Sequence, residues 1–205
     1  MANRFSIAGV LFPEFELLDL FGPFEMFGLL PEHFDLRLVS ENGDNVASNQ
    51  GPISVVDYSF DDSPPFDLLL VPGGRGTRRE VDNPVMLQWL RDQSAQANYV
   101  TSVCTGSALL ARAGLLDGRR ATTNKAAFEW VSAQGERVDW QKKARWVEEG
   151  RFFTSSGVSA GIDMSLAIIA SILGDETAVQ VATWSEYEWH RDPDWDPFAS
   201  IYGLA

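Results

Sequence analysis

Short apolar runs alternate along the chain with segments in which apolar residues recur every three or four positions. The apolar runs have the length and composition of buried strands and lie at residues 5–12, 34–40, 66–71 and 99–103, with a weaker strand at 121–123. The periodic segments predict helices at residues 17–30, 105–113, 126–133, 160–173 and 177–187, and another that begins at Asn83-Pro84. Repeated strand-then-helix units predict an α/β fold with a mostly parallel sheet.

Turn residues add detail to this picture. Residues 41–45, Glu-Asn-Gly-Asp-Asn, predict a hairpin turn that carries the 34–40 strand into a partner at 46–48, and a further short strand is expected at 53–58. A second hairpin is expected between 145–147 and 152–154. Gly22-Pro23 falls inside the first helix and predicts a kink or a restart. No internal repeat or linker interrupts the chain, so residues 1–205 are expected to form one domain.

Composition narrows the class of protein. Hydrophobic residues make up 45% and charged residues 22% of the 205 positions, which is typical of a globular domain. The formal charge of −13 opposes binding to nucleic acid or to anionic lipid. No apolar run approaches the ~18 residues of a membrane span, and the first residues lack the pattern of a secretory leader. A single Cys excludes an intrachain disulfide and fits a reducing compartment, so we expect a cytoplasmic protein.

Three groups with chemical potential follow predicted strands. Asp19 comes after the first strand, Gly73-Gly74 after the 66–71 strand, and Cys104 directly after the 99–103 strand. Ligands of open α/β sheets bind beyond the carboxyl ends of the strands, so we expect these residues to meet at one edge.

Cys104 lies in Ser102-Val-Cys-Thr-Gly106, which has small residues two before and two after a nucleophilic side chain. This spacing is typical of a nucleophile elbow, a sharp strand-to-helix turn that exposes its central residue. The positive end of the following helix would favour the thiolate. A buried apolar filler is an equally good interpretation of a lone Cys. Asp19, taken alone, is better explained as an acid that stabilises a helix N-terminus.

Five blocks of sequence occur in an order that resembles a known family. They are Phe12-Pro-Glu…Leu18-Asp-Leu-Phe-Gly-Pro23, Val71-Pro-Gly-Gly74, Val103-Cys-Thr-Gly-Ser107, Ala113-Gly-Leu-Leu-Asp-Gly-Arg-Arg-Ala-Thr-Thr123 and Gly157-Val-Ser-Ala-Gly-Ile-Asp163. The chain resembles the ThiJ/PfpI superfamily of class I glutamine amidotransferase-like folds over about residues 5–187. Within it, the chain most resembles bacterial isocyanide hydratases and the sensor domains of AraC-type regulators. The resemblance implies a flavodoxin-like three-layer α/β sandwich, and it implies a homodimer.

The resemblance also implies roles for individual residues. Cys104 matches the nucleophile and Asp19 the carboxylate that serves as general acid and base in the hydratases. The backbone N–H groups of Gly74 and Thr105 match the donors that stabilise a developing anion. Val158 matches an apolar residue placed against the thiol, and Gly73 would complete the pocket. The implied reaction hydrates an isocyanide to an N-substituted formamide through a thioimidate on Cys104, without a cofactor.

One departure from the family pattern weakens some activities. Many relatives carry His after the Ala-Thr-Thr run, where this chain has Asn124, and His33 and His190 match no family position. A Cys–His dyad is therefore not expected, which counts against protease, glyoxalase and deglycase activities. The alternative function is a non-enzymatic ligand or oxidant sensor in which Cys104 forms a sulfinate held by Asp19. A regulator would carry a DNA-binding helical module after the domain, and none is expected in the short stretch after residue 187.

Other motifs in the sequence give weaker evidence of function. Gly74-Arg-Gly76 fails as a dinucleotide fingerprint because Arg79 stands at the third glycine position. Asp192-Pro-Asp-Trp-Asp196 fails as a calcium loop, and one Cys with two distant His gives no zinc spacing, so no metal is expected. The extension from about residue 188 is acidic and aromatic. We expect it to fold back over a groove, and a sharper hypothesis has it close the pocket or pack across a dimer.

Overall fold

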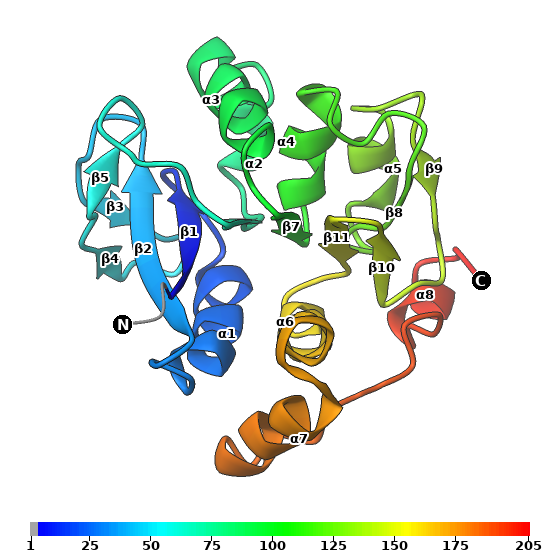
Figure 1. Ribbon diagram of the computed structural model, residues 1–205. Coiled ribbons are helices and arrows are strands. Elements are labelled where there is room, and N and C mark those ends of the chain that lie inside the picture. Colours follow the sequence, from blue (N-terminus) through cyan, green and yellow to red (C-terminus); the bar gives the residue numbers. More distant parts are fainter. Residues whose placement is uncertain (1–3) are drawn as a thin grey trace.

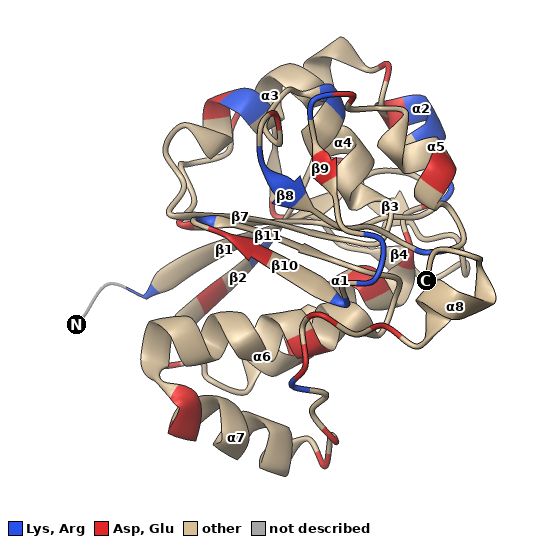
Figure 2. Ribbon diagram, turned by 90° about the vertical axis from the view of Figure 1, so that its right-hand side faces the viewer, with Lys and Arg blue, Asp and Glu red and all other residues tan. Residues whose placement is uncertain are grey.

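A computed structural model describes residues 4–205 as a seven-stranded sheet enclosed by two layers of helices (Figure 1). The strand order is β10-β11-β7-β6-β1-β2-β5, and every neighbouring pair is parallel except β10 with β11. Figure 2 shows α2, α3, α4 and α5 on one face of the sheet and α1, α6 and α7 on the other. This confirms the α/β three-layer sandwich.

The strands and helices follow in regular alternation over most of the chain. The strands of the large sheet are β1 (Phe5–Leu11), β2 (Phe34–Ser40), β5 (Tyr58–Ser59), β6 (Leu68–Val71), β7 (Tyr99–Val103), β10 (Trp146–Glu149) and β11 (Phe152–Ser155). The short strands β3 (Val46–Ala47) and β4 (Ile53–Ser54) form one small sheet, and β8 (Arg120–Ala121) and β9 (Asp139–Trp140) form another. The helices are α1 (Leu17–Gly28), α2 (Thr77–Glu80), α3 (Pro84–Ser94), α4 (Gly106–Arg112), α5 (Phe128–Ser132), α6 (Ala160–Leu173), α7 (Asp175–Trp184) and α8 (Phe198–Ile201).

The central strands and their helices form where the sequence pattern places them. All four residues of β6 are buried, as expected for a strand covered on both faces. Helix α3 begins with Pro84 at its first position, and the Asn83 side chain caps it by accepting the N–H of Val85 at 3.0 Å. The predicted hairpin of β10 and β11 is confirmed.

The hairpin expected after β2 is wrong. Gly43 does form a turn, with a φ of +76°, but the chain then moves away from β2 instead of pairing with it. Both edges of β2 are occupied by parallel partners, β1 and β5, so β3 pairs with β4. For the same reason the strand expected at 53–58 divides into β4 and β5, which belong to different sheets.

Helix α1 runs unbroken through Gly22-Pro23, so the predicted restart is wrong. Gly22 instead permits a close approach to α6, because a Cβ at this position would lie 2.9 Å from Cγ1 of Ile162. The short elements α2, β9 and α8 were not predicted. They are too brief to give a periodic signal.

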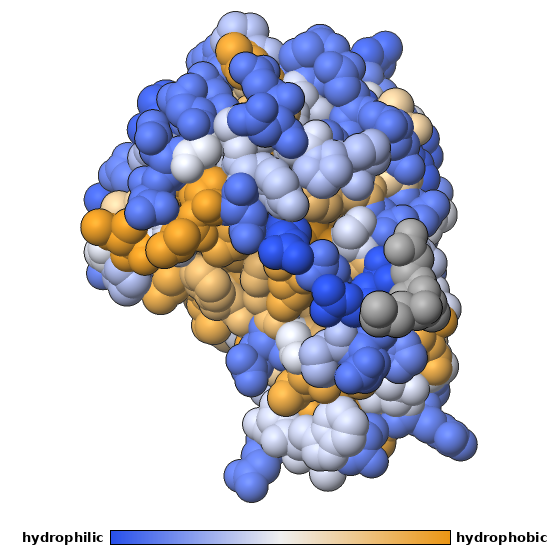
Figure 3. Space-filling model, turned by 60° about the vertical axis from the view of Figure 1, so that its left-hand side comes forward, coloured by the Kyte–Doolittle hydropathy of each residue, from blue (hydrophilic) through white to orange (hydrophobic). Residues whose placement is uncertain are grey.

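The surface is largely acidic, and apolar side chains are exposed in places. Within residues 4–205, no helix combines the length and apolar character that a membrane crossing requires. Figure 3 shows that apolar surface gathers in one area of the face it displays. Exposed apolar side chains of α1 and of the β4 region are Leu18, Phe21, Ile53 and Val55.

Candidate active site

Cys104 occupies a sharp turn between β7 and α4. Its φ is +57°, a left-handed conformation that a residue other than glycine adopts at a cost. The turn holds because the N–H of Cys104 donates to the carbonyl oxygens of Ser155 and Ser156 at 3.2 and 3.1 Å. Gly106 makes the turn possible, since a Cβ there would lie 2.2 Å from the carbonyl oxygen of Val71. The nucleophile-elbow geometry predicted from the spacing of small residues is therefore present.

The thiol of Cys104 borders a pocket of about 310 Å³. The residue is 7% exposed, so it is enclosed but reachable from the pocket. Among the residues that line this pocket are Gly74, Thr105, Asn124 and Val158. The pocket lies beyond the carboxyl end of β7, where the α/β topology predicts a ligand.

Asp19 reaches the same place from the first turn of α1. The residue is completely buried, and its Oδ2 accepts the N–H of Gly73 at 2.8 Å. Its Oδ1 is buried without a hydrogen-bond partner among the described residues, and the carboxyl group lies close enough to the thiol of Cys104 for its charge to raise the pKa of that thiol. Gly73 must be small, because a Cβ would lie 2.5 Å from the Thr105 nitrogen and 2.8 Å from Asp19 Oδ2. Three predicted site residues from separate segments are thus brought together.

Burial raises the pKa of Asp19 from 3.8 to about 8, although the N–H of Gly73 stabilises the carboxylate. Asp19 lies in the first turn of α1, as the helix N-terminal interpretation expects, but burial has a larger effect on its pKa than the helix does. Burial also raises the pKa of the Cys104 thiol, and the negative charge of Asp19 raises it further. The N–H groups of Thr105 and Val158 oppose this rise. Both groups therefore keep their protons at neutral pH.

This result corrects the expected effect of the helix N-terminus. The dipole of α4 was predicted to favour the thiolate of Cys104, but the helix has only seven residues. The loss of hydration in a buried site outweighs that effect. Because the two groups interact, they titrate as a pair, and the pair first loses a proton as the pH rises towards 8.

The two predicted backbone donors lie side by side. The N–H of Thr105 is directed at the sulfur of Cys104 and opposes the rise in its pKa. The N–H of Gly74 donates to the Thr105 hydroxyl at 3.0 Å, and Gly74 has a φ of +121°. The Thr105 hydroxyl also meets the hydroxyl of Thr77 at 3.2 Å, a contact that sequence reasoning missed.

Val158 contributes both its backbone and its side chain to the surroundings of the Cys104 thiol. Its N–H faces the thiol of Cys104, and its φ of +48° is rare for a β-branched residue. Strain of this kind is held in place by the surrounding structure and gathers at functional sites. The sequence offered no signal for it, because Val is among the residues least suited to this conformation.

Asn124 lines the cysteine pocket at the position where many relatives carry His. Its Oδ1 accepts the N–H of Ala127 at 3.0 Å, which fixes the side chain at the start of α5. Neither His33 nor His190 is among the described residues that line the pocket. The site therefore pairs the cysteine with a carboxylic acid.

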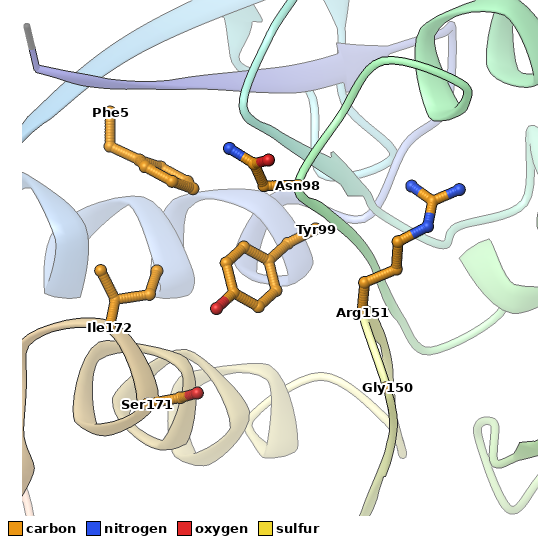
Figure 4. Close-up of a pocket in the computed structure, with 7 residues that line it drawn as sticks. All are labelled: Phe5, Asn98, Tyr99, Gly150, Arg151, Ser171 and Ile172. Carbon is orange, nitrogen blue, oxygen red and sulfur yellow. The ribbon is translucent and has the colours of Figure 1, made fainter.

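Outside the cysteine pocket, we considered another hollow and the possibility of a metal site. A hollow of about 560 Å³, drawn in Figure 4, includes Phe5 and Tyr99, the first residues of β1 and β7, and so lies at the amino ends of the strands. Its lining residues include no Cys, His, Asp or Glu, so it holds neither a thiol nor a general base of the carboxylate or imidazole kind. Within residues 4–205, no group of three or more such side chains is arranged to hold a metal ion.

Asp163 in α6 fastens the C-terminal extension. Its carboxylate pairs with Arg145 at 2.6 Å, and it accepts the Tyr187 hydroxyl at 3.1 Å and the His190 N–H at 2.9 Å. The extension thus folds back onto the domain, yet Trp195 remains 55% exposed. Sequence reasoning missed the pairing of Arg145 with Asp163, because the two residues lie on different elements.

The fold and the site together define an α/β protein with a cysteine on a nucleophile elbow and a buried acid beside it. The chain belongs to the DJ-1/PfpI family, whose model matches residues 6–171.

Relatives of known name include both an enzyme and regulators. The chain is 39% identical over 182 residues to isonitrile hydratase from Pseudomonas putida, covering 89% of this chain and 78% of that protein. It is 31% identical over 195 residues to the HTH-type transcriptional regulator GbdR from Pseudomonas aeruginosa, covering 93% of this chain but only 53% of that protein. A crystal structure of a ThiJ/PfpI family protein from Pseudomonas syringae superposes with a TM-score of 0.84 at 32% identity, covering 91% of this chain and 76% of that one.

Proposed function

We propose that this protein hydrates an isocyanide to an N-substituted formamide, with Cys104 as nucleophile and Asp19 as general acid and base. The observation that carries the proposal is the contact of a buried carboxylic acid, with a pKa raised to about 8, with the elbow thiol. Such an acid is able to give and take a proton near neutral pH. The similarity to isonitrile hydratase from Pseudomonas putida supports the same class of reaction.

In the first step the sulfur of Cys104 attacks the terminal carbon of the isocyanide. The carbon forms a C–S bond and takes up the one proton that Cys104 and Asp19 share. The product is a thioimidate in which the carbon bears hydrogen, sulfur and a double bond to nitrogen. Asp19 leaves this step as a carboxylate, ready to act as a base.

In the second step a water molecule adds to the thioimidate carbon. The Asp19 carboxylate takes one proton from the water, and the imine nitrogen ends with one proton. The C–S bond then breaks, the carbon becomes the formyl group, and the proton returns to the Cys104–Asp19 pair. The sum is one isocyanide and one water consumed for one N-substituted formamide, so no cofactor is required.

Backbone groups supply the electrostatic support for these steps. We assign the N–H of Thr105 to stabilise charge on the sulfur and on the reacting carbon, because it already faces the thiol. The N–H of Gly74 takes the same role when it leaves the Thr105 hydroxyl, which it contacts at 3.0 Å. Gly73 positions Asp19, and Val158 excludes water from the sulfur.

The sensor alternative draws on the similarity to regulators. The regulator GbdR is about twice as long as the matching region, so its activity as a whole protein rests on more than this domain.

We also propose that two copies of the chain pair and that the protein acts in the cytoplasm on a small molecule, without nucleic acid or membrane. The exposed apolar side chains of α1, Leu18 and Phe21, provide surface suited to a partner copy. Light scattering of the purified protein tests the pairing: a mass of one chain at micromolar concentration contradicts it.

The function is tested by following loss of an isocyanide together with appearance of its formamide. Purified protein and the Cys104→Ala variant are compared at pH 8 with cyclohexyl isocyanide. The proposal expects turnover by the native protein and none above background by the variant. Equal rates for the two proteins would remove the hydratase assignment.

A further inference from the structure

A second hollow adjoins the cysteine pocket. Its volume is about 210 Å³, and it shares Asn124, Ala126 and Val158 with the pocket of Cys104. Phe198 and Tyr202, which are contributed by the C-terminal extension, line it as well. The two hollows are therefore neighbouring parts of one site, separated by side chains of the pocket itself.

The second hollow suits an apolar group. Phe198 and Tyr202 are 49% and 52% exposed, so aromatic surface is available to a ligand. An isocyanide is linear at its C≡N–R unit, so its organic group points away from the carbon that Cys104 attacks. Asp19 is completely buried, so the organic group has to extend outward, and Asn124 and Val158, which line both hollows, give it a path from the thiol to the second hollow. The next surface it meets is the hollow beside Phe198.

Helix α8 is held in place by buried polar contacts. Asp196 is buried beside Lys125, with Oδ2 and Nζ 4.0 Å apart, and its Oδ1 accepts the N–H of Phe198 at 3.0 Å. Lys125 in turn donates to the Thr122 hydroxyl at 2.8 Å and to the Ala144 carbonyl at 2.6 Å. In Figure 1 the extension begins at the end of α7 and runs to α8, which lies apart from α7 in this view.

These contacts link the extension directly to the reaction site. Lys125 follows Asn124, which lines both hollows, and Asp196 precedes the aromatic helix by two residues. Ala199 is 2% exposed and anchors the middle of α8. Phe198 therefore stands in a fixed position before any ligand binds, which lowers the entropic cost of recognition.

We propose that α8 forms the subsite for the organic group of the substrate, with Phe198 and Tyr202 as its specificity-determining residues. The proposal rests on the hydratase function proposed above and names its substrate class: isocyanides that carry a ring or another bulky apolar group. A volume of about 210 Å³ accommodates a six-membered ring, whereas a methyl group would leave most of it empty.

The test compares a large and a small isocyanide. We measure kcat and KM for cyclohexyl isocyanide and for methyl isocyanide with Phe198→Ala and Tyr202→Ala. Ile201→Ala is the matched control, since Ile201 lies on the same helix, is 70% exposed and does not line the hollow. We expect kcat/KM for the cyclohexyl compound to fall roughly tenfold or more, mainly through KM. For methyl isocyanide, and for the control variant with both compounds, the change should stay below about twofold.

Equal losses for both isocyanides in the two aromatic variants would overturn the subsite. No loss for either would do the same, and so would an Ile201→Ala effect of the same size. Light scattering on each variant shows whether a changed oligomeric state is the cause, in which case α8 is an interface between copies and the subsite proposal is wrong.

A binding measurement that needs no turnover tests the subsite separately from the hydratase function. Cys104→Ala is titrated with N-cyclohexylformamide and N-methylformamide, and binding is followed by nuclear magnetic resonance. The subsite predicts tighter binding of the cyclohexyl compound, roughly tenfold, and loss of that preference in Cys104→Ala/Phe198→Ala. Equal affinities, or no binding of either compound, would contradict the subsite whatever the kinetics show.

Discussion

Asp19 and Cys104 lie beside one another inside the protein, and burial makes both groups hold their protons more tightly than they would in water. Burial is the larger cause for both groups, and the interaction between them adds to the effect on the thiol. The N–H of Gly73 fixes Asp19 Oδ2 at 2.8 Å, so the carboxyl group cannot turn away. This pair is the basis of the proposed chemistry, and its properties are measurable without any substrate.

The first prediction concerns the reactivity of the thiol. The charge of Asp19 raises the pKa of Cys104, so Asp19→Asn should shift the alkylation of Cys104 by iodoacetamide to lower pH. The rate is followed by intact mass from pH 6 to pH 10. In the native protein the rate should rise only at the alkaline end of this range, because burial and the charge of Asp19 raise the pKa of the thiol. A midpoint unchanged by Asp19→Asn, or shifted upward, would contradict the contact between the two side chains.

The second prediction concerns stability against pH. The pKa of Asp19 is raised from 3.8 to about 8, so between these values the folded protein keeps a proton that the unfolded chain has lost. Asp19 therefore favours the folded state fully below pH 3.8, and this contribution is lost as the pH rises to 8. Asp19→Asn removes the dependence. Relative to the native protein the variant should gain stability steadily from pH 4 to pH 8, by at most roughly 6 kcal/mol.

Urea unfolding at several pH values measures this difference. Comparing the two proteins at each pH cancels the titration of all other groups. A constant difference between pH 4 and pH 8 would show that Asp19 has an ordinary pKa in the folded protein.

The third prediction concerns the elbow. A Cβ at Gly106 would lie 2.2 Å from the Val71 carbonyl oxygen, so Gly106→Ala should force β6 and α4 apart and destabilise the protein by more than about 2 kcal/mol. Gly28→Ala is the control, because its Cβ would make an ordinary contact at 3.6 Å with Leu36. Chemical denaturation of both variants measures their free energies of unfolding. If Gly106→Ala were as stable as Gly28→Ala, the elbow would be looser than described.

The fourth prediction concerns the anchor of the C-terminal extension. Asp196→Ala leaves the buried ammonium of Lys125 without its partner and removes the acceptor for the Phe198 N–H. The expected loss is about 3–5 kcal/mol. Adding Lys125→Met should recover part of this loss, because the unpaired charge is then gone. Limited proteolysis should also cut the extension faster in Asp196→Ala. Unchanged stability together with unchanged cleavage would contradict the anchoring role.

The sequence contained enough information for the main elements and for the meeting of the site residues. Small residues around Cys104 predicted the elbow, and the order of strands predicted that Asp19 and Gly73 lie beside it. The hairpin after β2 failed because a local turn signal at Gly43 does not show that both edges of β2 are taken by distant strands. Local sequence patterns predict turns well, but they predict the pairing of distant strands poorly.

Burial was the other property that the sequence could not supply. The helix dipole beside Cys104 is visible in the sequence, whereas the desolvation that outweighs it depends on Asp19 and on every element packed around the thiol. The contact that anchors α8 was missed for a similar reason, since α5, β9, β10, β11, α6 and α7 lie between Lys125 and Asp196 in the sequence. The catalytic roles of Cys104 and Asp19 are predictions that these experiments address, and the roles of Gly74 and Thr105 are predictions as well.

The most direct test of the proposed chemistry is to capture the bond between Cys104 and the substrate carbon. Asp19→Asn lacks the base that activates water, so an aryl isocyanide should accumulate on it as a covalent adduct. Intact-mass and peptide-mass measurement should find the mass of one isocyanide added at Cys104, with no adduct on Cys104→Ala/Asp19→Asn. Formamide released at the native rate by Asp19→Asn, or an adduct on any residue other than Cys104, would contradict the proposed mechanism.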